Sequence, residues 1–363
     1  MTQRLEYIDQ LKGLAMLLVV IGHIIVFCGL GYDNIFIRNI TMMNMPLFFF
    51  LNGLVISEKM SLKGLLRKTC QLLLPFFSWG ILMTLYRNST FLDFLFNYWK
   101  YGYWYLLVLL EFFIAQVGLN NINLLINKKK RWWIDVLVFL LLYQTLRFSA
   151  RFISDEISVL IDYWQFVAYF PYFFLGAFIK RHFLIDKMLT CGNLIITLIL
   201  LFLLPLYMLW YNEMYISIVQ MVLPINIFLL LFMIFGLFSV EYNQSSKHRG
   251  VKIVMKINAI LSMIGKHTLS IYMMQFFLFR FINLETLFSL LYEGHNYFAI
   301  FFISALIAIL ICYLCMLGEW ILMKSQLLSF LFFWEKYVIR KIQETGCNQL
   351  DSFINITVDF GLC

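Results

Sequence analysis

A histidine inside the first apolar segment is the residue whose chemistry is most informative. His23 lies in Leu11–Leu30, a run that is almost wholly apolar apart from Lys12. Eleven positions separate Lys12 from His23, about three turns of an α-helix, so the two residues share one face and lie roughly 16 Å apart along the axis. Ionisable groups within a membrane are costly, and they often mark functional sites. This face is therefore the first candidate site.

Two roles are open for each of these residues. The His23 imidazole can take a proton from a hydroxyl near neutral pH, which is the action of a general base. A histidine that only bonds to helix backbone or to a neighbouring side chain fits the spacing equally well. Asp9 is three positions before Lys12 and can pair with it at the inner surface. In the other interpretation, Asp9 and Lys12 are charged anchors that fix the end of the helix at the membrane surface.

A carboxylate in the fourth apolar segment is the next candidate. Glu111 lies within Trp104–Gln116. A carboxylate at membrane depth requires a partner or a hydrated cavity. Glu111 therefore orients a histidine, binds a sugar hydroxyl, or serves as the structural partner of a buried arginine or tyrosine.

Two basic groups are candidates for binding anions. Lys63, Arg67 and Lys68 end an inner loop, where they either anchor the third segment or bind an anionic cytosolic donor, since guanidinium groups suit phosphates. Arg147 and Arg151 lie on the predicted outer side, against the usual bias. They bind a phosphate or acidic sugar, or they pair with nearby acidic residues: Asp155, Glu156 or Asp162.

The composition identifies the class of protein. The 363 residues are 62% hydrophobic and 13% charged, with a mean hydropathy of +0.83. Soluble domains of this length do not have such a composition. The net charge of +8 comes from residues in short loops, so it indicates membrane orientation and not nucleic-acid binding. The chain is predicted to be an all-α polytopic membrane protein in contact with membrane lipid.

Apolar runs of about 20 residues, the length that spans a bilayer, predict ten transmembrane helices. They lie near residues 11–31, 42–57, 69–87, 102–119, 132–148, 163–179, 191–210, 215–240, 259–280 and 297–323. With both termini in the cytoplasm, only six of the 28 lysines and arginines fall in outer segments: Arg38, Arg87, Lys100, Arg147, Arg151 and Arg280. This bias favours ten helices, because omitting one would scramble the alternation.

The chain divides into a membrane domain and a tail. Residues 1–323 form the predicted ten-helix domain, and residues 324–363 a cytoplasmic tail. The tail begins with an apolar and aromatic run followed by cationic residues, which predicts a short interfacial amphipathic helix. No metal site is predicted, since the histidines lack ligand spacing and the Cys312–Cys315 pair lies inside an apolar helix.

Several stretches, in order, carry a resemblance to a known family. Ile8–His23 reads IDQLKGLAMLLVVIGH and resembles the first helix of acyltransferase family 3, whose hallmark is Arg or Lys, ten residues, then His. Met45–Gly53, MPLFFFLNG, resembles the family's MPLFFFLSG. Further resemblance lies in RKTCQLLLPFFSWG from Arg67, YWYLLVLL from Tyr103 and GKHTLSIYMMQ from Gly265. Gln275 stands where many members carry histidine, and Asn52 replaces the usual serine.

The resemblance implies an activity. Members of this family are integral-membrane proteins that transfer an acyl group, commonly acetyl, from cytosolic acyl-CoA to a hydroxyl of a surface or lipid-linked glycan. On this basis His23 activates the acceptor hydroxyl or assists passage of the acyl group, and Lys12 contacts the anionic part of the donor. The resemblance and the loop charge together predict a cell membrane, specifically a bacterial inner membrane. The alternative is a translocator of polysaccharide or lipid-linked sugar without acyl chemistry. A glycan polymerase would require a larger outer loop than this chain has.

Overall fold

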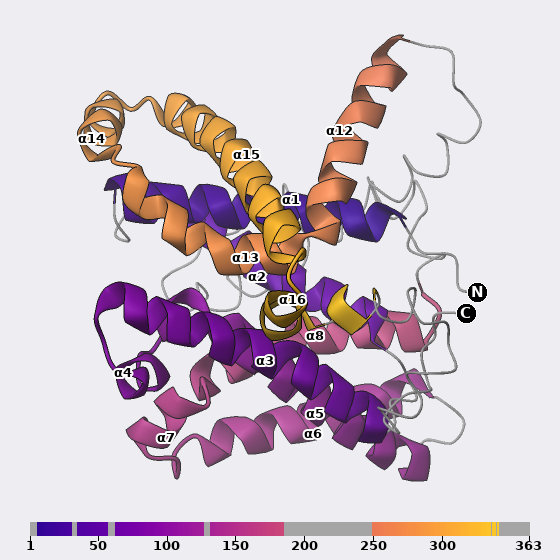
Figure 1. The fold of residues 1–363 in the computed structure, drawn as a ribbon. Helices are drawn as coiled ribbons and strands as arrows, with labels where there is room; N and C mark the ends of the chain where they lie inside the picture. The colour runs from indigo at the N-terminus through magenta and orange to yellow at the C-terminus, as the bar shows by residue number, and fades with distance from the viewer. Residues whose placement is uncertain are drawn as a thin grey trace. The chain divides into compact units, whose positions relative to one another are not determined.

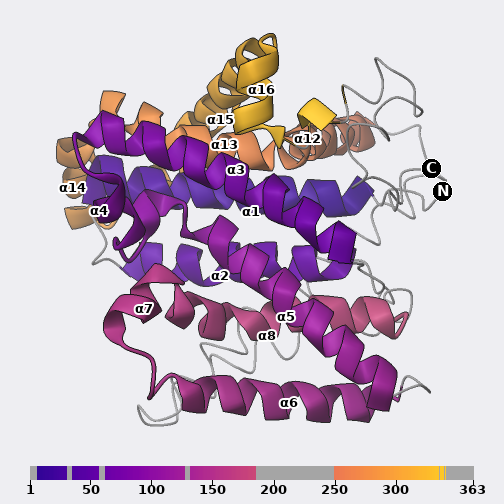
Figure 2. The same cartoon turned by 60° about the horizontal axis from the view of Figure 1, so that its bottom comes forward.

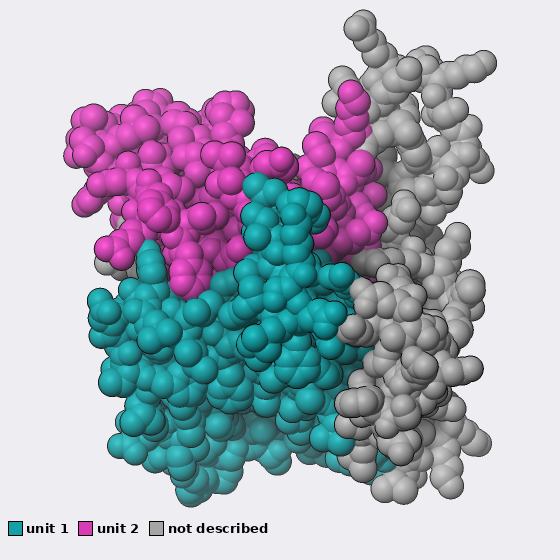
Figure 3. Space-filling model, in the orientation of Figure 1, with its two compact units in different colours: residues 1–3, 55–178, 317–363 teal, residues 4–54, 179–316 magenta. Residues whose placement is uncertain are grey.

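The computed structural model describes residues 6–30, 35–56, 62–126, 131–184, 249–334, 336–338 and 340. All regular elements in these ranges are helices (Figure 1). They fall into two compact units, coloured separately in Figure 3. One unit contains residues 55–178 and the chain from 317 onward, and the other contains residues 4–54 and 179–316.

The first unit is a bundle of four long helices with short helices in its connections (Figure 2). Its elements are α3 (Leu62–Arg87), α4 (Phe91–Leu95), η2 (Lys100–Gly102), α5 (Trp104–Ile126), α6 (Trp132–Ser149), α7 (Asp155–Leu160), most of α8 (Tyr163–Arg181) and α16 (Gln326–Phe332). Phenylalanine rings fill its core. Phe112 of α5 lies 5.6 Å, centroid to centroid, from Phe170 of α8, and Phe139 of α6 stacks on Phe174 of α8 at 3.9 Å. Such aromatic packing joins α5, α6 and α8.

The second unit is organised around the first helix. Its elements are α1 (Glu6–Ile25), the π-helix η1 (Val26–Leu30), α2 (Ile35–Val55), α12 (Arg249–Lys266), α13 (Thr268–Leu278), η4 (Phe279–Phe281), α14 (Glu285–Glu293) and most of α15 (Tyr297–Leu322). α12 and α13 both pack against α1, and Figure 1 shows α13 running beside it.

Two glycines allow α1 and α12 to cross with their backbones in contact. A Cβ atom on Gly13 would lie 1.9 Å from the carbonyl oxygen of Leu261, and one on Gly265 would lie 1.8 Å from that of Asp9. No other residue fits at either position without a shift of the helices, because the obstacle is backbone. Small residues permit this kind of close approach between membrane helices.

The start of the tail packs within the first unit, against α3. α16 begins after Ser325, whose side chain accepts a hydrogen bond from Leu328 N–H as an N-cap. The Trp79 ring of α3 lies 4.8 Å from the Phe332 ring. Beyond α16, Lys336 forms an ion pair with the buried Glu319 of α15.

The helices agree with seven of the predicted spans in position. The spans predicted at 191–210 and 215–240 lie outside the described residues. Within the described ranges, four helices are long and apolar enough to cross a membrane: Tyr7–Leu30, Gly64–Arg87, Trp104–Ile122 and Tyr297–Leu322. A fifth is possible if Thr268–Phe281 and Glu285–Glu293, bent by 90°, form one span. The total of ten and the cytoplasmic location of both termini therefore stay predictions.

The span predicted at 259–280 is wrong as a single helix. It divides at His267, whose φ of −114° and ψ of 16° are not helical. α12 ends with Gly265 and Lys266, a glycine and a cation of the kind that favour a helix C-terminus. The apolar content of the segment is continuous across this break, which is why hydropathy alone misses it.

Candidate active site

His23 lies at the end of α1 where the regular helix changes into a π-helix. α1 ends at Ile25, and η1 covers Val26–Leu30. Single turns of π-helix occur frequently at functional sites. The imidazole is surrounded by aromatic rings: Phe27 at 5.7 Å, Phe276 of α13 at 5.0 Å and Phe279 of η4 at 6.0 Å between centroids. This arrangement gives His23 an apolar wall, although the residue as a whole remains partly exposed.

The polar neighbour of His23 is Gln275, one position before Phe276 on α13. Its carboxamide is completely buried and lies in hydrogen-bonding reach of the His23 ring. Its Nε2 donates to the carbonyl oxygen of Tyr272 at 3.2 Å. His23 Nδ1 and Gln275 Oε1 are both buried, and neither completes a hydrogen bond of normal geometry with the described residues. The sequence places Gln275 in the family motif but gives no sign that it faces His23.

Lys12 and Asp9 lie on the same continuous helix as His23. α1 is unbroken from Glu6 to Ile25, so the eleven-residue spacing retains its geometry of about 16 Å along the axis. Asp9 is buried and Lys12 is partly exposed. Both adjoin the crossing with α12, where the Asp9 carbonyl faces Gly265. The backbone around this pair is therefore held firmly.

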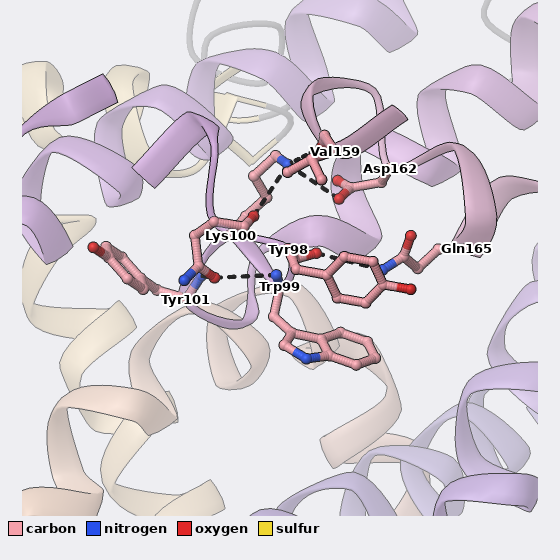
Figure 4. Close-up of polar contacts among 8 residues, drawn as sticks. Tyr98, Trp99, Lys100, Tyr101, Val159, Asp162 and Gln165 are labelled. Carbon is pink, nitrogen blue, oxygen red and sulfur yellow. Dashed lines mark hydrogen bonds and ion pairs between the residues drawn. The ribbon is translucent and has the colours of Figure 1, made fainter. Parts of the chain in front are cut away.

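Glu111 lies on α5 in the other unit, together with a buried ion pair. Lys100 Nζ donates to Asp162 Oδ1 at 3.1 Å and to the carbonyl oxygens of Val159 at 2.5 Å and Asn97 at 3.2 Å (Figure 4). Glu111 is close enough to raise the pKa of Lys100, although burial has the largest effect and lowers it. The structure thus places Glu111 within electrostatic range of Lys100 and Asp162, a relation that the sequence alone does not predict.

The Lys100–Asp162 pair is enclosed. The exposed fractions are 0% for Lys100 and 1% for Asp162. Burial raises the pKa of Asp162 to about 7, while Lys100 acts in the opposite direction. Lys100, Tyr101 and Asp162 all have positive φ, at 45°, 51° and 48°. Non-glycine residues persist in this strained region only where their surroundings fix them. The one available signal was that Lys100 is a basic residue on the predicted outer side.

Arg147 lies in the last turn of α6, and Arg151 follows just after the helix ends at Ser149. Both are exposed, and the Arg151 guanidinium lies 5.6 Å from the centroid of the Phe148 ring. Within the described part of the chain neither arginine forms an ion pair. Asp162, one of their proposed partners, pairs with Lys100 instead.

The basic residues of the predicted inner loop lie in the first turns of α3. Lys63 is in the helix, but its side chain lies outside the described residues. Arg67 and Lys68 are partly exposed. Lys68 Nζ donates to Gln71 Oε1 at 2.8 Å and lies 5.8 Å from the centroid of the Phe113 ring on α5. The described residues contain no group of three His, Cys, Asp or Glu side chains that could hold a metal ion.

These observations define a multi-pass membrane protein built from helices, with a histidine enclosed by aromatic rings near the end of its first span. A family model described as an acyltransferase domain, that of acyltransferase family 3, matches residues 5–317. The chain belongs to this family, and it is a membrane acyltransferase. No curated protein and no solved structure matches it significantly.

Proposed function

We propose that this protein transfers an acyl group, specifically acetyl, from acyl-CoA to a hydroxyl of a cell-surface or lipid-linked glycan in a bacterial inner membrane. The family supports acyl transfer in general. The observation that carries the finer proposal is His23, a partly exposed imidazole with a buried Nδ1 in an aromatic enclosure. An imidazole so placed can act on a hydroxyl while bulk water is kept away.

The proposed reaction is a single acyl transfer. His23 removes the proton of the acceptor hydroxyl, whose oxygen attacks the thioester carbonyl. The carbon–sulfur bond breaks, the acyl group remains on the acceptor oxygen, and the CoA thiolate takes the proton from the imidazolium. Each atom is accounted for without a metal ion or a resident cofactor. Glu111 is a further candidate for this chemistry, and it lies within electrostatic range of Lys100 and Asp162.

The test is transfer of label from acetyl-CoA. Membranes that contain the protein are incubated with acetyl-labelled acetyl-CoA and compared with membranes that lack it, and the label in purified glycan is measured per sugar. Label above the control supports acyl transfer. Unchanged acetyl content per sugar, together with loss of surface glycan in cells lacking the protein, would favour a translocator instead.

We expect Lys12→Ala to weaken use of the donor. The Lys12 ammonium is placed, by the predicted topology, where it meets the phosphates of acyl-CoA from the inner side. Loss of one such contact corresponds to about a tenfold rise in the KM for acyl-CoA, or about 1.4 kcal/mol. The measurement is initial rate against acyl-CoA concentration at fixed acceptor. Lys12→Arg, which keeps the charge, serves as the control, and an unchanged KM in Lys12→Ala would contradict this role. The same assay tests Lys63, Arg67 and Lys68.

We expect Arg147→Ala and Arg151→Ala to alter handling of the acceptor. Neither side chain has an ion-pair partner among the described residues, so each remains available to an anionic group of the glycan. Each substitution should raise the acceptor concentration needed for half-maximal rate by about three- to tenfold, with the KM for acyl-CoA unchanged. Arg280→Ala, at another predicted outer position, is the matched control. Acylation at the wild-type level in both variants would assign the two arginines a structural role.

A further inference from the structure

We propose that Gln275 is the positioning residue of His23: its carbonyl oxygen accepts a hydrogen bond from His23 Nδ1–H and leaves Nε2 to take the proton of the acceptor. The catalytic consequence rests on the proposed function. The hydrogen bond itself does not depend on the proposed function, because it is a property of the two side chains alone.

The first step is the match between two buried atoms. His23 Nδ1 and Gln275 Oε1 are each buried without a completed hydrogen bond among the described residues. The side chains that carry them lie in hydrogen-bonding reach of each other. Buried polar atoms almost always have a hydrogen-bond partner. A hydrogen bond between these two atoms would give each of them one.

The second step is the orientation of the carboxamide. Gln275 Nε2 donates to the Tyr272 carbonyl oxygen within its own helix, at 3.2 Å. That bond uses the amide nitrogen as a donor and leaves Oε1 for the neighbouring ring. An amide oxygen carries no hydrogen, so it can only accept. The ring nitrogen that faces it must be the protonated one.

The third step is the absence of polar competition from the enclosing rings. Phe27, Phe276 and Phe279 contact the imidazole but supply neither a hydrogen-bond acceptor nor a donor of ordinary strength. A neutral imidazole has one N–H and one lone pair, and the partner of one nitrogen decides the state of the other. With Nδ1–H directed to Gln275, the lone pair is on Nε2.

The fourth step is the type of residue at position 275. Glutamine does not titrate. The tautomer that it selects is therefore fixed at every pH at which His23 is neutral.

The experiment reads the tautomer directly. The full-length protein is prepared with ¹⁵N-histidine in lipid bilayers at about pH 8, and solid-state NMR assigns which ring nitrogen of His23 carries the proton, with His23→Gln identifying the signal. We expect Nδ1–H in the wild type. Gln275→Leu should move the population toward Nε2–H, and Gln275→Glu, which keeps an acceptor, should restore Nδ1–H. An Nε2–H tautomer in the wild type would overturn the proposal without reference to any variant.

A matched control is available on α5. Gln116 is also a buried glutamine in a predicted span, and its Nε2 donates to Asn120 Oδ1 at 2.9 Å. Gln116→Leu should leave the His23 signal unchanged. If Gln116→Leu shifts that signal as Gln275→Leu does, the shift reflects a non-specific disturbance of the helix packing, and the proposal fails.

The kinetic readout separates this proposal from the proposed function. Gln275→Leu should lower kcat by about tenfold or more, leave the KM for acyl-CoA unchanged, and be rescued in part by Gln275→Glu. If the wild type transfers no acyl group while its His23 is the Nδ1–H tautomer, the proposed function fails and the hydrogen bond stands. If transfer occurs and Gln275→Leu retains wild-type kcat, the positioning role fails alone.

Discussion

His23→Gln is expected to lower the rate of acyl transfer by at least about a hundredfold, because general acid–base catalysis contributes 10²–10⁴-fold in enzymes. The amide of glutamine keeps polar contacts but cannot take a proton from a hydroxyl. The variant should insert into membranes at the wild-type level, since the helix around it is retained. The measurement is the initial rate of label transfer from acetyl-CoA, normalised to the amount of protein in the membrane.

The control for this variant is the same substitution at a histidine outside the site. His295 is exposed, and its Nδ1 lies 3.2 Å from the Tyr297 hydroxyl in a connection before α15. His295→Gln should retain the wild-type rate. If His23→Gln retains it too, the imidazole takes no part in the reaction, and the acyl transfer depends on another residue.

The second large effect is expected at the buried ion pair of the other unit. Lys100→Met should lower the free energy of unfolding by about 3–5 kcal/mol, since removal of one member of a buried pair leaves an uncompensated charge. Asp162, at 1% exposure, would be that charge. The backbone at Lys100, Tyr101 and Asp162 would also lose the contact that helps to hold its positive φ values. The measurement is a denaturant titration of the purified protein in detergent.

The effect of pH on this variant follows from the Asp162 carboxyl. Burial raises its pKa to about 7 in the folded protein, above the ordinary value of 3.8, and Lys100 opposes that rise. The folded state thus binds this proton more tightly than the unfolded state, and the stabilisation is lost as pH rises through about 7. Without Lys100 the folded pKa is higher still. The cost of Lys100→Met should therefore be smaller at pH 5 than at pH 8.

A double variant separates lost pairing from poor packing. Lys100→Met with Asp162→Leu removes both charges, and we expect it to recover most of the stability that the single substitution loses. A Lys100→Met protein that is as stable as the wild type at pH 8 would contradict the structural role of the pair. A double variant less stable than either single variant would show that the hydrogen bonds of Lys100 matter more than its charge.

The sequence allows prediction of the helices but not of all their partners. Apolar runs place α6, α8 and α15 within two residues at both ends, because each run is a local property of the chain, whereas α3 starts seven residues earlier and α5 ends seven residues later than predicted. The break at His267 is missed because the apolar character continues across it. Hydropathy also does not reveal that Pro46 lies within α2, which starts at Ile35 and not near 42.

In the candidate site, too, relations within one helix can be predicted from the sequence, and contacts between distant segments cannot. The relation of Lys12 to His23 is local to one helix and follows from the helical repeat. The approach of Gln275 to His23, and of Asp162 to Lys100, joins residues far apart in the chain. No periodicity encodes such pairs in a single sequence, and only the packing of α1 with α13, or of the connections beside α4 and α7, brings them together.

Under the proposed function, the unbroken first helix also sets what length of donor molecule can reach both Lys12 and His23. With Gly13 and Gly265 bringing backbone against backbone, α1 is held in its register. Lys12 and His23 lie on one unbroken helix, so about 16 Å along its axis separates them. The helix thus fixes the distance that a thioester donor must span to reach both side chains. Under the proposed function, a carrier shorter than that length would present its acyl carbon to His23 but would gain no binding energy from Lys12.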